Sequence, residues 1–309
     1  MNPAVHPVDI VRVGASGEVA GRDVAATEEP LEIRLGSASF VTIMRTPGFD
    51  EQLAAGFLLS EQIVTAPDQV GSIRHCADDD GCEIGNVLNV WLTGEAAARA
   101  ATVMAGRRLV TANSSCGVCG RRSIDDLLHG IAPLGPGFTV DRSVVAALPD
   151  RLRAAQRAFD QTGGLHAAGL FDADGQLLQV AEDVGRHNAV DKVIGAELLA
   201  GRLPLADRVL FVSGRTSFEI VQKAVCAGIP VVASVSAPSS LAISLAADAR
   251  VTLLGFVRNG AFNIYAGAER VAAGQALTTP GSGPLTAAAP ANRSEAAVPV
   301  DQAGMKSQT

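Results

Sequence analysis

Residues 208–240 read RVLFVSGRTSFEIVQKAVCAGIPVVASVSAPSS, and the fold is predicted from them outward. Residues 208–212 and 231–235 are nearly continuous apolar runs, which is typical of strands buried on both faces. Residues 217–227, between them, have the length and apolar spacing of a helix. A strand, a helix and a second strand in this order predict a parallel or mixed sheet covered by helices.

The same alternation continues on both sides of this segment and predicts an α/β domain over residues 140–277. An Asp-Gly pair at residues 174–175 marks a turn between two short apolar runs. The further predicted elements are strands at 165–171, 177–180 and 251–257, and helices at 140–161, 187–200 and 239–247.

Residues 28–106 predict a separate, smaller α+β domain. Two apolar-alternating runs, 31–35 and 39–45, are separated by Gly36, which indicates a hairpin. A helix is predicted at 49–62 and a third strand at 86–92. The remaining segments are an N-terminal segment, 1–27, a mobile linker with a short helix, 107–139, and a disordered tail rich in Pro, Ala, Ser and Gly, 278–309.

Composition narrows the class of protein. The chain has 309 residues, 48% of them hydrophobic and 18% charged, which suffices for one large domain or two smaller ones. Its formal net charge of −7 argues against non-specific nucleic-acid binding. The sequence has neither an apolar run of about 20 residues, as a membrane helix needs, nor a secretion signal. Five cysteines form no disulfide framework, so we expect a cytoplasmic protein.

Residues 111–122, TANSSCGVCGRR, carry a Cys-x-x-Cys pair, Cys116 and Cys119. The pair can be two small residues in a turn, or half of a zinc site that lacks the second pair such sites use. It can also serve sulfur or redox chemistry, which the sequence favours. A thiol reacts as thiolate, and Arg121, Arg122 and a following helix are placed to lower its pKa.

Histidines and the other cysteines give weaker signals. His75, Cys76 and Cys82 can be interpreted as a metal cluster, but we expect the polar residues 75–81 to be an inert surface loop. His166 and His187 are candidates for proton transfer near a ligand, but the sequence favours a structural histidine at each position.

Small polar turns follow the buried strands and begin the next helices. Ligands of open α/β sheets bind beyond the carboxyl ends of strands, and helix N-termini favour phosphates. For any single turn an ordinary N-cap is the better explanation. Turns at 182–186, 213–217 and 236–240 together predict a phosphate-bearing ligand, with candidate residues Gly214, Arg215, Thr216, Ser217, Ser236 and Ser239.

Taken together, these motifs resemble the formate dehydrogenase accessory sulfurtransferase family, FdhD, over roughly residues 28–265. The resemblance implies a sulfur carrier that receives persulfide sulfur from a cysteine desulfurase. The sulfur would pass to the molybdenum cofactor, in its bis-molybdopterin guanine dinucleotide form, before insertion into formate dehydrogenase. It also implies a fold similar to the cytidine deaminases. The segments that carry it are SSCGVCG, TGGLHAAGLF, AEDVGRHNAVDKVIG, SGRTSFEIVQKA, SAPSSLAISLA and GFVRNGAFNIY.

The resemblance also implies site residues. The persulfide position falls on Cys116, with Cys119 as its partner, although which accepts sulfur first stays open. The cofactor-contacting segment falls on Phe256, Val257, Arg258, Asn259, Gly260 and Ala261. Arg258 is placed either to pair with phosphate or to be a surface arginine at a strand end.

Two further points follow from the resemblance. Zinc deamination is not expected, because His166 begins His-Ala-Ala and lacks the glutamate of His-x-Glu, and we expect no permanent metal. A homodimer stays open. The alternative function is a chaperone that binds the cofactor, guanine nucleotide ends included, and delivers it without covalent sulfur transfer.

Overall fold

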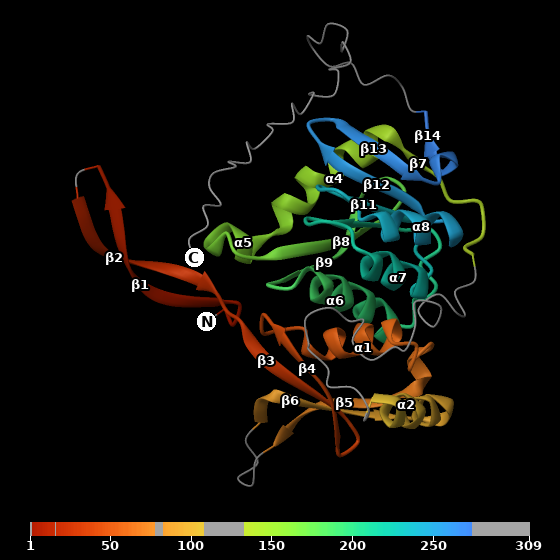
Figure 1. The fold of residues 1–309 in the computed structure, drawn as a ribbon, viewed down its shortest axis with the longest axis horizontal. Coiled ribbons are helices and arrows are strands. Elements are labelled where there is room, and N and C mark those ends of the chain that lie inside the picture. Colours follow the sequence, from red (N-terminus) through yellow and green to blue (C-terminus); the bar gives the residue numbers. More distant parts are fainter. Residues whose placement is uncertain (1, 16, 78–82, 108–132, 274–309) are drawn as a thin grey trace, which may run out of the picture. The chain divides into compact units, whose positions relative to one another are not determined.

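A computed structural model describes residues 2–15, 17–77, 83–107 and 133–273 (Figure 1). Its largest sheet has six strands in the order β13-β12-β11-β10-β8-β9. β10, β11 and β12 are parallel, whereas β8, β9 and β13 pair antiparallel with their neighbours, so the predicted mixed sheet is confirmed. The strands are β8 (His166–Phe171), β9 (Leu177–Asp183), β10 (Val209–Val212), β11 (Val231–Ser234), β12 (Thr252–Arg258) and β13 (Ala261–Ala266).

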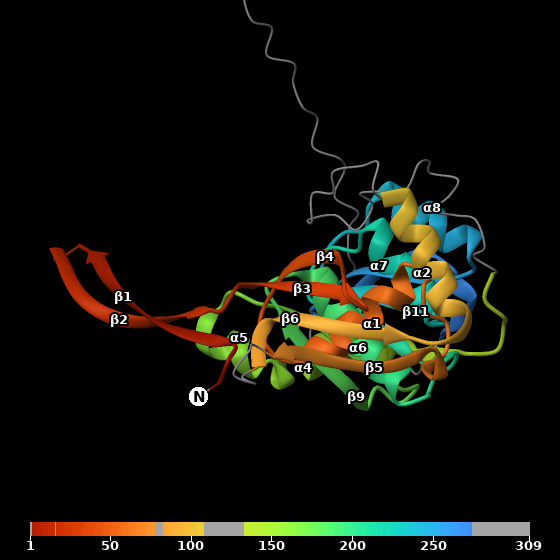
Figure 2. The same ribbon diagram turned by 90° about the horizontal axis from the view of Figure 1, so that it is seen from below.

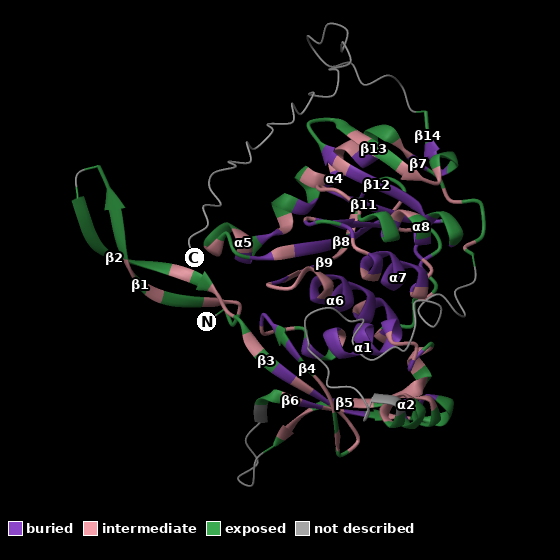
Figure 3. Ribbon diagram, in the orientation of Figure 1, coloured by how far each residue is buried: buried purple, intermediate pink, exposed green. Residues whose placement is uncertain are grey.

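Helices cover both faces of this sheet, as the apolar runs of its strands require. Alternate residues of a strand face opposite sides. Leu210 and Val212 therefore belong to the apolar cluster of the α6–α7–α8 face, and Val209 and Phe211 to that of the α4 face. Figure 3 shows the buried strands between these layers. The helices are α4 (Arg142–Ala155), α5 (Arg157–Thr162), α6 (Arg186–Leu199), α7 (Phe218–Cys226) and α8 (Ser240–Asp248).

The prediction of a single helix over residues 140–161 is wrong. Residues 140–141 form strand β7 (Val140–Asp141), which pairs with β14 (Val271–Ala272). The helix then breaks at Gln156, which has a ψ of 74°. The carboxylate of Glu182, from β9, accepts hydrogen bonds from the backbone N–H groups of Ala158 and Phe159, at 2.9 and 2.7 Å. A distant side chain thus caps α5 and stabilises the break.

The N-terminal half contains a second sheet, in the order β4-β3-β6-β5, with helices α1 and α2 (Figure 2). The predicted hairpin is confirmed, and Gly36 at its turn has a φ of 60°. His75 and Cys76 lie on β5, so the prediction of a loop there is wrong. The elements are β3 (Glu29–Leu35), β4 (Ala38–Arg45), α1 (Asp50–Ser60), a 3-10 turn (Pro67–Gln69), β5 (Val70–Ala77), β6 (Glu83–Leu92) and α2 (Gly94–Arg107).

The two sheets share one apolar core, joined by the contact between α1 and α6. A Cβ atom built on Gly56 would lie 2.0 Å from the carbonyl oxygen of Asp191, and one on Gly195 would lie 1.9 Å from that of Gln52. The two helix backbones therefore touch. Between them Lys223 donates to the buried carboxylate of Asp191 at 2.7 Å. The proposed boundary between two domains stays a prediction.

The N-terminal segment contains a β-hairpin that the sequence had not indicated, β1 (Val5–Gly14) and β2 (Gly17–Ala26). Its strands are mostly exposed and have no clear apolar face, which explains why periodicity missed them. No helix in the described ranges is long and apolar enough to cross a membrane. The linker pair Cys116 and Cys119, Cys82 and the predicted tail lie outside the described residues.

Candidate functional site

The polar turns predicted from the sequence meet at the carboxyl edge of the central sheet. The carbonyl oxygen of Thr216 accepts a hydrogen bond from the N–H of Ser239 at 2.9 Å, which joins the turn after β10 to the turn after β11. The carbonyl oxygen of Ser236 accepts from the N–H of Phe256 at 3.2 Å, which adds the end of β12. Because β8 is antiparallel to β10, its first residue, His166, lies at the same edge. The structure thus groups the candidate residues, whose part in binding stays a prediction.

Within these turns the candidate residues have different surroundings. Ser239 caps α8, where its hydroxyl accepts from the N–H of Ala242 at 3.2 Å. Thr216 is fully buried, and its hydroxyl has no hydrogen-bond partner among the described residues. Gly214 is buried and Arg215 is exposed. Only Arg215 therefore offers a charge to solvent at this turn.

Phe256 begins the segment implied by the resemblance, and it lies in an irregular part of β12. It has a φ of 53°, and a bulge interrupts the pairing there. The guanidinium of Arg258 lies 5.4 Å from the centre of the Phe256 ring. Val257 is fully buried in the apolar cluster under α4, so only its backbone is available to a ligand.

The segment then turns tightly into β13. Arg258 pairs with Ala261, and Asn259 and Gly260 between them have φ values of 52° and 74°. Two left-handed residues are what a two-residue hairpin turn requires. The turn leaves Arg258, Asn259, Gly260 and Ala261 exposed at the edge.

His187 lies at the start of α6 and contacts the start of α7. Its Nε2 atom is 2.9 Å from the hydroxyl of Ser217 and 3.7 Å from the carboxylate of Glu219. Burial, and then the charges of Arg186 and Lys223, lower the pKa of His187 to about 4, against the opposing effect of Glu219. His187 is therefore neutral at pH 7 and can either donate to Ser217 or accept from it.

His166 is packed beside Gly214. A Cβ atom on Gly214 would lie 3.4 Å from Nδ1 of His166 and 3.5 Å from Cδ of Arg186, so a residue without a side chain lets the three approach. Burial and the charge of Arg186 lower the pKa of His166, although Asp183 opposes them. Two neutral imidazoles thus lie at the sheet edge.

The turn between β9 and α6 is stabilised by the side chain of Asp183, which is fully buried. Its carboxylate is 2.7 Å from the ammonium of Lys192 and accepts from the N–H groups of Thr46 and Gly185 at 3.1 and 2.8 Å. Asn188 donates a further hydrogen bond at 2.9 Å. This turn, predicted as a ligand-binding turn, is thereby fixed to the hairpin β3–β4.

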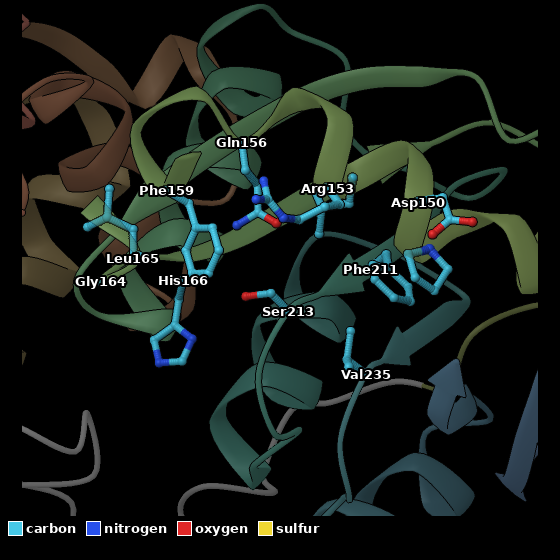
Figure 4. Close-up of a pocket in the computed structure, with 13 residues that line it drawn as sticks. Asp150, Arg153, Gln156, Phe159, Gly164, Leu165, His166, Phe211, Ser213 and Val235 are labelled. Carbon is cyan, nitrogen blue, oxygen red and sulfur yellow. The ribbon is translucent and has the colours of Figure 1, made fainter. Parts of the chain in front are cut away.

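A cavity of about 640 Å³ lies between α4–α5 and the sheet and reaches the same edge through Ser213 and Val235 (Figure 4). Sequence reasoning missed it because α4 and α5 had been treated as one helix with an apolar face. The signal available in the sequence was the row of polar residues Asp150, Arg153 and Gln156, which follow one another at intervals of three. Residues lining the cavity include Asp150, Arg153, Gln156, Phe159, His166 and Phe211.

The cysteines give no metal centre that can be described. No group of three or more His, Cys, Asp and Glu side chains within the described ranges could hold a metal ion. Cys76 and Cys226 are half-buried on β5 and α7.

Comparison with protein families identifies the relatives of this chain. The model of a family described as FdhD/NarQ matches residues 26–272. The chain belongs to the FdhD/NarQ family. The match includes both sheets and all the described turns at the edge of the larger one, and it leaves out nearly all of the hairpin β1–β2.

Members of the FdhD/NarQ family resemble this chain over most of its length. A protein from Mycolicibacterium paratuberculosis, named sulfur carrier protein FdhD, is 50% identical over 266 residues, which are 85% of this chain and 97% of the relative. A protein of the same name from Anaeromyxobacter dehalogenans is 50% identical over 258 residues, 82% of this chain and 90% of the relative. A crystal structure named as a formate dehydrogenase accessory protein from Desulfotalea psychrophila has a TM-score of 0.68 and 25% identity, covering 87% of this chain and 100% of that one.

Proposed function

We propose that this protein is a sulfur carrier for the maturation of formate dehydrogenase. It would accept persulfide sulfur from a cysteine desulfurase and transfer it to the molybdenum cofactor, bis-molybdopterin guanine dinucleotide, before that cofactor enters the enzyme. The observation that carries the proposal is the identity of about 50% to proteins named sulfur carrier protein FdhD over more than four-fifths of the chain. The Cys-x-x-Cys pair at Cys116 and Cys119 supplies the thiols.

The first half of the reaction is thiol–persulfide exchange. The thiolate of Cys116 or Cys119 attacks the outer sulfur of the desulfurase persulfide, and the desulfurase cysteine leaves as a thiolate. The sulfur–sulfur bond in the donor breaks as the bond in the carrier forms, so no external oxidant is needed. The cationic neighbours Arg121 and Arg122 favour the thiolate that begins this exchange.

The cofactor is the cargo of the second half, and the turns at the carboxyl edge are the place proposed for its phosphates. Arg215 and Arg258 are exposed there, next to the beginning of α7 and the end of β12. The hydroxyl of Thr216, which has no partner in the part of the chain that the structure describes, lies at the same turn. Helix N-termini with nearby arginines favour phosphate oxygens, which supports the proposal.

Complementation of cells that lack their own sulfur carrier tests the function. Cys116→Ala should leave the protein folded and abolish formate dehydrogenase activity, because the persulfide can no longer form at its proposed position. Cys226→Ala is the control, since Cys226 lies half-buried on α7 and is not part of the Cys-x-x-Cys motif. It should cost some stability and leave maturation intact. Full formate dehydrogenase activity with Cys116→Ala and Cys119→Ala combined, at normal protein level, would instead favour a chaperone without covalent sulfur transfer.

A further inference from the structure

The hairpin of β1 and β2 has no role in the function proposed so far. Each strand has ten residues, and Figure 3 shows that most of both strands is exposed. Val11, Val13 and Val19 are among the large apolar side chains that the described chain leaves exposed. An isolated two-stranded hairpin is at best marginally stable in water. The hairpin therefore offers an apolar surface that a further strand can stabilise.

The backbone of β2 has polar groups that are free to pair with such a strand. The N–H of Thr27 donates to the carbonyl oxygen of Ala4 at 3.0 Å, and these residues lie next to the paired ends of the two strands. Bonded and non-bonded pairs alternate along an antiparallel ladder. Every second residue of β2, including Glu18, Ala20 and Arg22, therefore points its N–H and C=O groups away from β1.

The two free edges of the hairpin differ in what they permit. The outward-facing residues of β1 include Pro7, which has no N–H group and protects an edge against pairing. β2 contains no proline. Its last residue, Ala26, is close to the rest of the chain, because a Cβ atom built on Gly164 would lie 3.4 Å from the Cβ atom of Ala26. The part of the β2 edge that is open to a partner therefore lies around Ala20.

The charges of β2 are complementary to those of a second β2. Glu18 and Arg22 point to the same face, two residues on either side of Ala20. If two copies of β2 pair antiparallel about a two-fold axis at Ala20, Glu18 of each copy lies directly opposite Arg22 of the other. Opposite charges in this position favour pairing, and like charges oppose it. Moving the axis by one residue places Arg22 opposite Ala20 or beyond the start of β2, so the charges select one register.

The contacts within one copy leave this complementarity available. Arg22 lies 3.4 Å from Asp9, but the two side chains are 87% and 88% exposed, and ion pairs in such positions contribute little to stability. Glu18 has no ion-pair partner among the described residues. On the other face of the hairpin, the same axis places Val19 opposite Gly21 of the second copy. An exposed branched side chain thus meets a residue that has none.

We propose that two copies of this protein associate through β2 and form one four-stranded sheet in the order β1-β2-β2-β1. Ala20 lies at the two-fold axis, where the two copies exchange a pair of backbone hydrogen bonds. Each copy contributes the same patch, as a closed dimer requires. The inference is independent of the sulfur-carrier function, because no residue of the hairpin takes part in that proposal.

Sedimentation velocity of the full chain over a range of concentrations tests the pairing. Ala20→Pro removes the outward N–H at the axis and no hydrogen bond within the hairpin, so it should weaken the association at least tenfold. Val11→Pro is the matched control, since Val11 lies directly opposite Ala20 and its N–H points to the outer edge of β1. This variant should associate as the wild type does, and the two variants should have similar unfolding temperatures.

Exchange of the two charges separates pairing from a structural role of the residues. Glu18→Arg alone and Arg22→Glu alone each place like charges opposite one another on both sides of the axis, so each variant should associate about tenfold more weakly than the wild type. An equimolar mixture of the two variants restores both pairs of opposite charges. The mixture should therefore associate about as tightly as the wild type.

Crosslinking locates the axis. Cα atoms of a bonded antiparallel pair lie about 5.5 Å apart, which a disulfide can span. Mild oxidation of Ala20→Cys should therefore join two copies at this position, as peptide mapping identifies. Val11→Cys is the control, because three strand spacings, roughly 14 Å, separate its two copies. The inference is overturned if the wild type stays monomeric at every concentration, if Ala20→Pro associates like the wild type, or if the mixture of charge variants associates no better than either alone.

Discussion

His187 shows how far the fold changes the chemistry of a single residue. Burial, with the neighbouring charges of Arg186 and Lys223, brings its pKa to about 4 from the ordinary value of 6.5. Its neutral imidazole contacts the hydroxyl of Ser217 at 2.9 Å. The sequence indicated His187 as either a proton carrier or a structural residue. The lowered pKa explains how the residue stays uncharged beside two cations.

This lowered pKa predicts a defined pH dependence of stability. The folded state resists protonation of His187 whereas the unfolded state does not, so stability is full above pH 6.5 and is lost as the pH falls toward 4. The loss attributable to His187 is on the order of 3 kcal/mol. Urea unfolding of the wild type and His187→Gln at pH 7 and pH 4 measures it. The variant should lose less stability than the wild type over this interval, and equal losses would contradict the account.

At the same scale, the sequence predicted residue types better than residue roles. Ser239 had two explanations, and the structure supports the N-cap, because its hydroxyl bonds the N–H of Ala242. Val257 was included in a cofactor-contacting segment, yet its side chain lies in the core. Neither outcome is visible in composition or spacing, since each depends on which way a side chain points.

At the scale of elements, two arginines from different elements serve one proposed site. Arg215 precedes α7, and Arg258 ends β12. Arg215→Ala and Arg258→Ala should each weaken guanosine diphosphate about tenfold or more, because a hydrogen bond to a charged group contributes about 1.5–3 kcal/mol. Arg208→Ala is the control, since Arg208 precedes β10 at the opposite edge of the sheet and pairs with Asp207. Calorimetry showing unchanged affinity in both test variants would remove these arginines from the site.

Elements with strong apolar periodicity were predicted well, and elements fixed by distant partners were not. The strands β10 and β11 lie within one residue of the expected positions. The break between α4 and α5 depends on Glu182, which is more than 20 residues away in the sequence. Residues 75–77, the end of β5, were predicted as part of a polar loop because of their residue types, although the same strand contributes Ile73 to the core.

At the scale of the whole molecule, α1 and α6 join the layers around the two sheets. Gly56→Ala should lower the free energy of unfolding by about 1–3 kcal/mol or more, because the added methyl group meets backbone atoms of Asp191 that cannot move away alone. Gly135→Ala is the control, since a Cβ atom there meets nothing within 4 Å. Urea unfolding measures both. A change of less than about 0.5 kcal/mol for Gly56→Ala would show that the two helices can separate at little cost.

This joint also explains why the domain organisation was only partly predictable. The sequence of each half specifies its own sheet. The contact of Gly56 with Asp191 and the hydrogen bond of Thr46 to Asp183 each join residues more than 130 positions apart. The ion pair of Asp183 with Lys192 joins two different elements. Such links arise from packing and have no local sequence signal.

The central claim is that the Cys-x-x-Cys pair carries sulfur, and peptide mass spectrometry tests it most directly. The protein is incubated with a cysteine desulfurase and cysteine, and the peptide that contains Cys116 and Cys119 is then analysed. We predict one added sulfur atom on this peptide in the wild type and none in the variant that lacks both cysteines, with Cys76 and Cys226 unmodified in each. A peptide that stays unmodified while the desulfurase is active, or sulfur that is found only on Cys76 or Cys226, would contradict the account.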